Sequence, residues 1–131
     1  MSRATGTFSV TGGSEQTTRE AAGEAKLTRV SGTQRFSGGI VGEGSVDWVF
    51  CYRPDRSARF LGLQRIEGAI DGRSGSLVME STGNHDGKRS NGRWRVIPGS
   101  GTGELAKISG EGTFEAPGGP DVSYELDYQL D

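Results

Sequence analysis

Apolar and polar residues alternate with a period of two along most of this 131-residue sequence. Val46, Trp48 and Phe50 fall on one face of such a stretch, and Ser45 and Asp47 fall on the other. Because successive side chains of a strand point to opposite sides, this pattern predicts strands with one buried and one wetted face. We expect eight strands, at about residues 3–10, 26–36, 39–53, 58–70, 74–83, 91–98, 110–116 and 121–130.

Turn-forming residues separate these stretches. Asp71-Gly72 is a two-residue hairpin signal, and Pro54 suits the second position of a β-turn. Short hairpins between sequential strands form a meander, and eight strands with one apolar face suffice to close a barrel without exposed edges. The sequence therefore predicts an all-β, antiparallel eight-stranded meander barrel that occupies residues 1–131 as a single domain. At most one short helix is expected, at 103–108, and residues 18–25 are expected to form a mobile loop.

Glycine is unusually frequent, with 23 residues in the chain, whereas average usage is about 7%. Glycine inside a strand costs about 0.5–1 kcal/mol relative to alanine, so many of them require a geometric reason. We expect the strand glycines to permit sharp bending and to make room for bulky neighbours such as Trp48 and Trp94. The positions concerned are Gly42, Gly44, Gly62, Gly68, Gly83, Gly92 and Gly112.

Charge and composition exclude several classes of function. The net charge is −2, which gives no general attraction for nucleic acid or an anionic membrane. One histidine and one cysteine leave no set of residues for a zinc site, and no phosphate-binding loop motif occurs. We therefore expect no metal, no cofactor, no nucleic-acid partner and no membrane partner. The N-terminus lacks an apolar secretory segment, so a cytoplasmic location is expected.

Several strings resemble a family of small bacterial proteins known only as a domain of unknown function. The most specific are Gly68–Ser76 (GAIDGRSGS) and Pro98–Leu105 (PGSGTGEL), and the resemblance extends from about Ala4 to Leu130. It implies an eight-stranded barrel similar to allene oxide cyclase and carries no established activity. The family commonly has a glutamate at the position of Gln64 and a histidine at the position of Ser81. If that pair performs chemistry in relatives, this chain has lost its titrating groups.

Nucleophilic catalysis has weak support. Ser81, His85 and Asp86 are the types of a catalytic triad, but His85 and Asp86 are adjacent and would point to opposite faces of a strand. We expect His85 to lie in a solvated turn. Cys51 is expected to be a half-buried structural residue.

The alternation places a mixed aromatic and polar set inside the barrel. One interpretation is that these side chains simply fill the lumen, as happens in small barrels. The other is a small apolar cavity with a few convergent polar groups, which is the usual form of a small-molecule site. The candidate catalytic residues are Tyr124, Tyr128 and Gln64, and the candidate ligand-binding residues are Trp48, Tyr52, Ser81, Trp94 and Phe114.

Three functions remain open. The first is a small-molecule-binding barrel for an apolar or amphipathic ligand, which the loss of the glutamate and histidine favours. The second is a cofactor-independent cyclase or isomerase that folds a flexible apolar substrate in the lumen and gains rate from effective molarity. The third is a structural or interaction barrel with a filled core. A homodimer is also expected, because Leu61, Leu63 and Val78 fall on outward faces.

Overall fold

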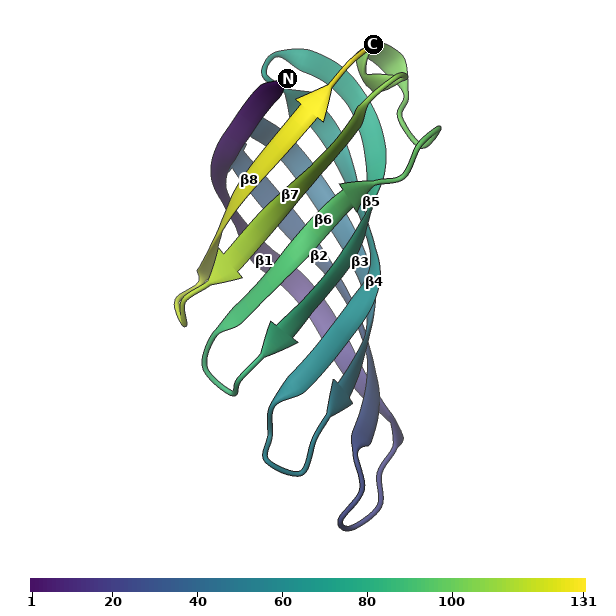
Figure 1. Cartoon of the computed structure of the whole chain (residues 1–131), viewed down its shortest axis with the longest axis vertical. Coiled ribbons are helices and arrows are strands. Elements are labelled where there is room, and N and C mark those ends of the chain that lie inside the picture. The colour runs from purple at the N-terminus through teal and green to yellow at the C-terminus, as the bar shows by residue number, and fades with distance from the viewer.

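Eight antiparallel strands close into a barrel in which each strand pairs with the next in the chain and β8 pairs with β1 (Figure 1). This computed structural model describes residues 1–131, and it confirms the all-β meander barrel that the alternation predicts. The only helical element is a 3-10 turn, η1 (Gly103–Leu105), and no helix is long and apolar enough to cross a membrane. The strands are β1 (Ser2–Arg19), β2 (Lys26–Gly38), β3 (Ile40–Tyr52), β4 (Ala58–Ile70), β5 (Arg73–His85), β6 (Ser90–Val96), β7 (Ser109–Ala116) and β8 (Asp121–Gln129).

β1 is far longer than the predicted strand at 3–10. It pairs with β8 only as far as Ser9, and it then continues to Arg19 against β2 alone. A register shift between Val10 and Gly12 marks the departure, and such bulges bend a strand and redirect it. Residues 10–19 thus pair only with residues 27–34 of β2, which pair on their other side with β3. We call residues 10–19 and 27–34 together the β1–β2 ribbon. The loop expected at 18–25 is correspondingly shorter, because strand pairing continues through Arg19.

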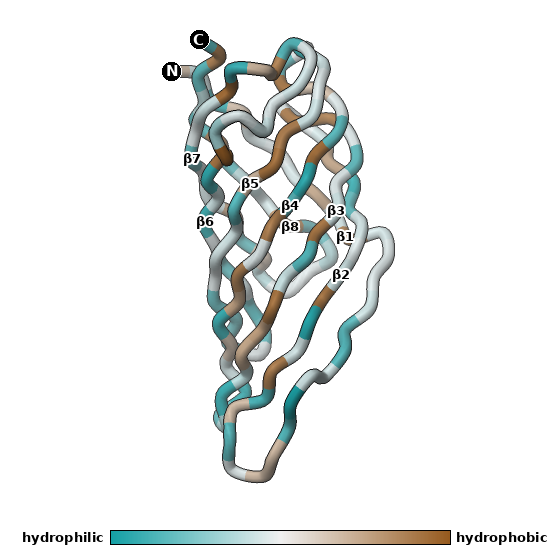
Figure 2. The backbone as a smooth tube through the Cα atoms, turned by 90° about the vertical axis from the view of Figure 1, so that its right-hand side faces the viewer, coloured by the Kyte–Doolittle hydropathy of each residue, from teal (hydrophilic) through white to brown (hydrophobic).

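The two ends of the barrel differ. Both termini and the segment between β6 and β7 lie at one end, whereas the hairpin loops at the other end are staggered (Figure 1). The β1–β2 hairpin extends furthest of these loops. Its backbone is mostly hydrophilic or neutral, while hydrophobic residues are concentrated along the strands of the barrel wall (Figure 2). The closed part of the barrel therefore carries the core, and the ribbon extends beyond it.

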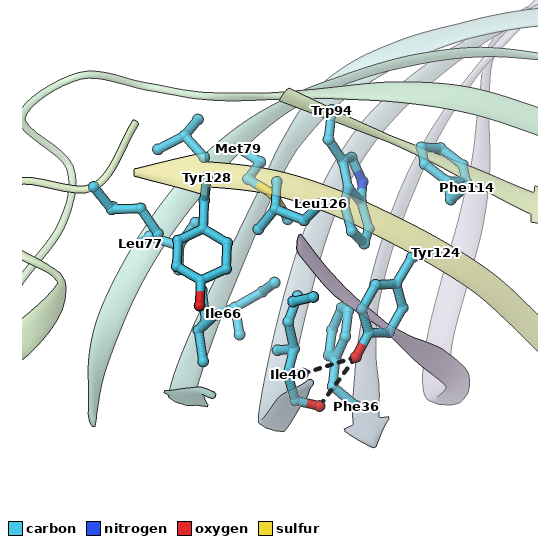
Figure 3. Close-up of a cluster of buried hydrophobic side chains, with 14 of the residues drawn as sticks. Phe36, Ile40, Ile66, Leu77, Met79, Trp94, Phe114, Tyr124, Leu126 and Tyr128 are labelled. Carbon is cyan, nitrogen blue, oxygen red and sulfur yellow. Dashed lines mark hydrogen bonds between the residues drawn. The ribbon is translucent and has the colours of Figure 1, made fainter. Parts of the chain in front are cut away.

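Aromatic side chains fill the closed part of the barrel (Figure 3). Phe8, Phe36, Trp94, Phe114 and Tyr124 are each less than 5% exposed. Their ring centroids lie 4.9–6.3 Å apart in neighbouring pairs, which is the range for tilted and edge-to-face aromatic contacts. The lumen at this level is thus packed with side chains. For Trp94, Phe114 and Tyr124, this agrees with the interpretation that the interior side chains simply fill the barrel.

The PGSGTGEL string covers an open edge of the sheet. β6 ends at Val96, so the β5 residues that precede Met79 have no strand partner on that side. The Thr102 backbone N–H donates to the Ser76 carbonyl at 2.9 Å, and the Ser76 N–H donates to Thr102 Oγ1 at 3.0 Å. Leu105 is 1% exposed and anchors the segment in the core. This segment therefore has a structural role, because it hydrogen-bonds to a strand edge that would otherwise be free to pair with another chain.

The strand glycines have the geometric role that their number predicts. At all seven predicted positions, a Cβ atom would come within 3 Å of a neighbouring atom. At Gly62 it would lie 2.0 Å from the Asp47 carbonyl oxygen and 2.6 Å from Cδ1 of Trp48. Gly62 thus provides the space into which the Trp48 indole extends.

Candidate functional site

Polar groups interrupt the apolar interior on five consecutive strands. We call this set the polar belt; it comprises one residue from each of β2 to β6, namely Gln34, Trp48, Gln64, Ser81 and Trp94. Four of the five are at most 2% exposed, and Trp48 is half-buried. Because a meander places sequential strands side by side, these side chains come together even though 60 positions separate the first from the last.

A directed chain of hydrogen bonds runs through the belt. Trp94 Nε1 donates to Gln64 Oε1 at 3.0 Å, and Gln64 Nε2 donates to Gln34 Oε1 at 2.5 Å. An indole N–H can only donate, so it fixes the carbonyl of Gln64 toward Trp94 and its amide toward Gln34. Gln34 must then accept with its carbonyl oxygen. The chain therefore ends in the NH₂ group of Gln34.

Three polar atoms of the belt are buried without a hydrogen-bond partner: Gln34 Nε2, Trp48 Nε1 and Ser81 Oγ. Trp48 and Ser81 are both neighbours of Gly62 in the strand register, so the two groups flank a position that has no side chain. A buried polar atom without a partner costs about 1–3 kcal/mol. Three in one region call for a specific explanation, because buried polar groups in native proteins are nearly always paired.

An apolar groove of about 490 Å³ lies beside the belt, lined by the β1–β2 ribbon and β3. Its apolar side chains are four in number, three of them valines from β1, β2 and β3. Val10 at its edge is 63% exposed. Gln34 and Trp48 line the groove as well as belonging to the belt. The groove therefore adjoins two of the three unpaired polar groups.

The ribbon is joined to the barrel wall by a carboxylate below the groove. Glu15 Oε2 accepts a hydrogen bond from Thr28 Oγ1 at 2.7 Å and another from the Tyr52 hydroxyl at 2.9 Å. These three residues lie on β1, β2 and β3. Lys26 Nζ lies 5.0 Å from the centroid of the Tyr52 ring, a geometry that favours a cation–π contact. Tyr52, a predicted ligand-binding residue, thus contacts the ribbon instead of lining the groove.

The environment of the tyrosines predicts an unusual titration. Burial, with the hydrogen bond to Glu15 and its charge, raises the pKa of Tyr52 to about 12, and burial also raises the pKa of Tyr124 and of Tyr128. We expect no tyrosine of the native protein to ionise at the ordinary value of 10.0. A spectrophotometric titration of tyrosinate, compared with the same titration in urea, measures this.

Folding raises these pKa values, so the protonated tyrosines contribute to the stability of the native state. This contribution is fully present below pH 10 and is lost as pH rises toward 12. Glu15→Gln keeps an acceptor and removes the negative charge, so it should lower the pKa of Tyr52 alone. A native tyrosine that titrates at its ordinary pKa would contradict the environment described here.

The two candidate catalytic tyrosines hydrogen-bond at the end of the barrel that holds both termini. The Tyr124 hydroxyl donates to the Ser37 carbonyl of β2 at 2.7 Å. It accepts from the Ile40 N–H of β3 at 2.9 Å (Figure 3). The Tyr128 hydroxyl donates to the carboxylate of Asp71 in the β4–β5 turn. Both hydroxyls thus have protein partners, and Gln64, the third candidate, has both ends of its amide engaged in the belt.

The triad residues are separate in the structure. His85 Nδ1 lies 2.7 Å from Ser90 Oγ, and the Asp86 carboxylate accepts from the backbone N–H groups of Lys88 and Arg89. Ser81 has no hydrogen-bond partner. His85 is the last residue of β5 and is half-buried, which differs from the solvated turn position expected from the sequence.

Comparison with known proteins places the chain in a family. The model of a family described as "Protein of unknown function (DUF3224)" matches residues 4–128. The chain belongs to the DUF3224 family. A search of curated proteins found no match. A crystal structure of a DUF3224 protein of unknown function from Shewanella oneidensis MR-1 is 23% identical, with a TM-score of 0.84, and the match covers 100% of this chain and 98% of that one. This likeness supports the fold.

Several residues of the site in this DUF3224 protein are not among those predicted from the sequence. Glu15 lies beyond the predicted first strand, which ends at Val10, and Val10 is not a predicted site residue. Gln34 lies between Val30 and Phe36 on the buried face of β2. A polar residue on an apolar face is the signal that could have identified it.

Proposed function

We propose that this DUF3224 protein binds a small, mainly apolar molecule in the groove lined by the β1–β2 ribbon and β3. The observation that carries the proposal is an apolar groove that adjoins buried polar groups without partners. Small-molecule sites usually combine a concave apolar wall with a few polar groups that orient the ligand. A ligand that supplies the missing partners would recover part of the cost of burying Gln34 Nε2 and Trp48 Nε1.

The cyclase or isomerase alternative has less support. Its candidate groups, Tyr124, Tyr128 and Gln64, already hydrogen-bond within the protein. A general acid or oxyanion donor needs a free hydrogen aimed at the reacting atom. The purely structural alternative accounts for the packed core but leaves the groove and its neighbouring unpaired groups without a role. Binding is therefore the function that the geometry favours.

A neutral fluorescent dye tests the proposal. N-phenyl-1-naphthylamine should become brighter on binding, because its emission increases in apolar surroundings. Val10→Asp places a charge on the groove wall and should weaken dye binding about tenfold or more, which corresponds to 1.4 kcal/mol. Val10 is 63% exposed, so the fold should tolerate the change.

Val41→Asp is the matched control. Val41 is 56% exposed and lies next to the buried Ile40, on the outer face of β3. It should leave dye binding unchanged. An absence of enhancement with the unmodified protein, or an equal loss in both variants, would reject the groove as a binding site.

We further propose that the protein forms a homodimer through the outer face of β3 and β4. Leu61 and Leu63 are 51% and 49% exposed, and Val49, which is paired with Leu61, is 44% exposed. Val78 contributes less than the sequence suggests, because it is half-buried beside the segment that contains Ser100. Light scattering should give about twice the chain mass of 13.9 kDa, and Leu61→Lys with Leu63→Lys should give the monomer. A monomeric mass for the unmodified protein would refute the proposal.

A further inference from the structure

We infer that the polar group of the ligand is an uncharged carbonyl oxygen, held by Gln34 Nε2 and Trp48 Nε1. This inference rests on the proposed function and specifies its ligand class. A ketone, an aldehyde, an ester and an amide all have the required group. The inference stands on two features: the direction of the hydrogen-bond chain and the absence of a cation in the groove lining.

The direction of the chain makes both unpaired nitrogens donors. Trp48 Nε1 carries a hydrogen and has no accepting lone pair, so its partner must be an acceptor. Gln34 could in principle turn its amide around. The Trp94 indole prevents this through Gln64, whose own orientation requires the carbonyl of Gln34 as its acceptor. The groove thus adjoins two donors and no free acceptor from these two side chains.

The charges around the groove select an uncharged acceptor. Among the residues that line it, Glu15 is the only charged one, and no lysine or arginine is present. Lys26 lies over the Tyr52 ring on the far side of Thr28 from the groove. A carboxylate that entered next to Gln34 would lose its hydration and would meet a like charge and no cation, which is costly. A carbonyl oxygen gains two donors without that cost.

Ser81 holds the third unpaired polar group of the belt. Its hydroxyl is fully buried, unpaired, and separated from Trp48 in the register only by Gly62. A carbonyl oxygen has two lone pairs and can accept from two donors at once. Gln34 Nε2 and Trp48 Nε1 are therefore enough to satisfy it, and Ser81, which does not line the groove, is not needed as a partner.

Competition against the bound dye tests the ligand class. 2-Decanone and decanoate have the same number of carbons, and only decanoate is charged. 2-Decanone should displace N-phenyl-1-naphthylamine at a concentration about tenfold or more below that of decanoate. Decanoate that competes as well as the ketone would overturn the inference, while the dye binding itself would leave the proposed function intact.

The two tryptophans give a direct readout with an internal control. The chain contains only Trp48 and Trp94, so a ¹H–¹⁵N spectrum has two indole signals. On addition of 2-decanone, the Trp48 N–H signal should move downfield because it gains an acceptor. The Trp94 N–H already donates to Gln64, so its signal should stay in place. A Trp48 signal that remains unmoved at saturating ketone would refute the assigned donor.

Two variants separate the donors from the apolar wall. Trp48→Phe and Gln34→Leu should each weaken 2-decanone binding about fivefold to tenfold, the value of one hydrogen bond. Dye binding should fall by a smaller factor than ketone binding in each variant, because the dye has no carbonyl and loses only apolar contact with the groove wall. If Gln34→Leu disturbs the fold, Trp48→Phe decides the outcome, since it removes only an unpaired N–H and part of a ring. Equal losses of ketone and dye binding in Trp48→Phe would contradict the inference.

Discussion

Replacing Trp94 with alanine should lower the free energy of unfolding by about 3–5 kcal/mol, the usual cost of deleting a large buried aromatic side chain. Trp94 is 1% exposed, and its ring centroid lies 5.5 Å from that of Phe114 and 5.6 Å from that of Tyr124. The change also leaves Gln64 Oε1 buried without its donor, which adds to the loss. Small domains have only about 5–15 kcal/mol of stability in total. Urea unfolding followed by circular dichroism measures the effect.

A pair of milder substitutions isolates the hydrogen bond from the packing. Trp94→Phe keeps an aromatic ring and removes the donor to Gln64, so it should cost about 1–3 kcal/mol. Trp48→Phe removes an N–H that has no partner and should cost distinctly less. Equal costs for the two would show that the belt is not organised around the Trp94 donor.

Gln64→Glu should destabilise the protein by about 3 kcal/mol at pH 8 and by much less at pH 4. The side chain at this position is fully buried, and burial raises the pKa of a carboxyl group. A protonated carboxyl can still accept from Trp94 and donate to Gln34, whereas a carboxylate cannot donate. Because the folded state holds the proton more tightly, stability falls as pH rises above the ordinary pKa of the carboxyl.

Unfolding curves at a series of pH values measure this loss, and the unmodified protein is the control. Gln64→Leu has the same partners to lose but no charge, so its cost should be independent of pH. A Gln64→Glu variant that is equally stable at both ends of the pH range would show that the belt tolerates a buried charge. That result would weaken the inference of an uncharged ligand.

The barrel follows from the sequence because a closed meander has one continuous buried face. Every strand of the closed part must then alternate, and Trp94, Phe114 and Tyr124 lie inside as the alternation predicts. The second half of β1 has no such signal. Residues 11–19 are exposed throughout, so hydrogen bonding to β2, and not burial, sets their register. Periodicity cannot detect a strand of this kind.

The roles of the buried polar side chains were harder to predict than their positions. Alternation places Tyr124 and Tyr128 inside the barrel, but their partners are the Ser37 carbonyl near the end of β2 and the Asp71 carboxylate in the β4–β5 turn. Which turn comes within reach depends on how far the strands are staggered around the barrel. That stagger is a property of the closed sheet, and no local pattern of residues records it. For the same reason, the hydrogen-bond chain from Trp94 through Gln64 to Gln34 could not be predicted from the sequence.

Because β1 separates from β8 after Ser9, its two halves should differ in how often their backbone hydrogen bonds open. Up to Ser9 the backbone amides of β1 are held between two neighbouring strands, whereas beyond it they have a partner on one side only. The second half of β1 can therefore open and reclose by local fluctuation while the closed barrel stays intact. These local openings should be far more frequent than global unfolding, in a protein whose core is fully packed.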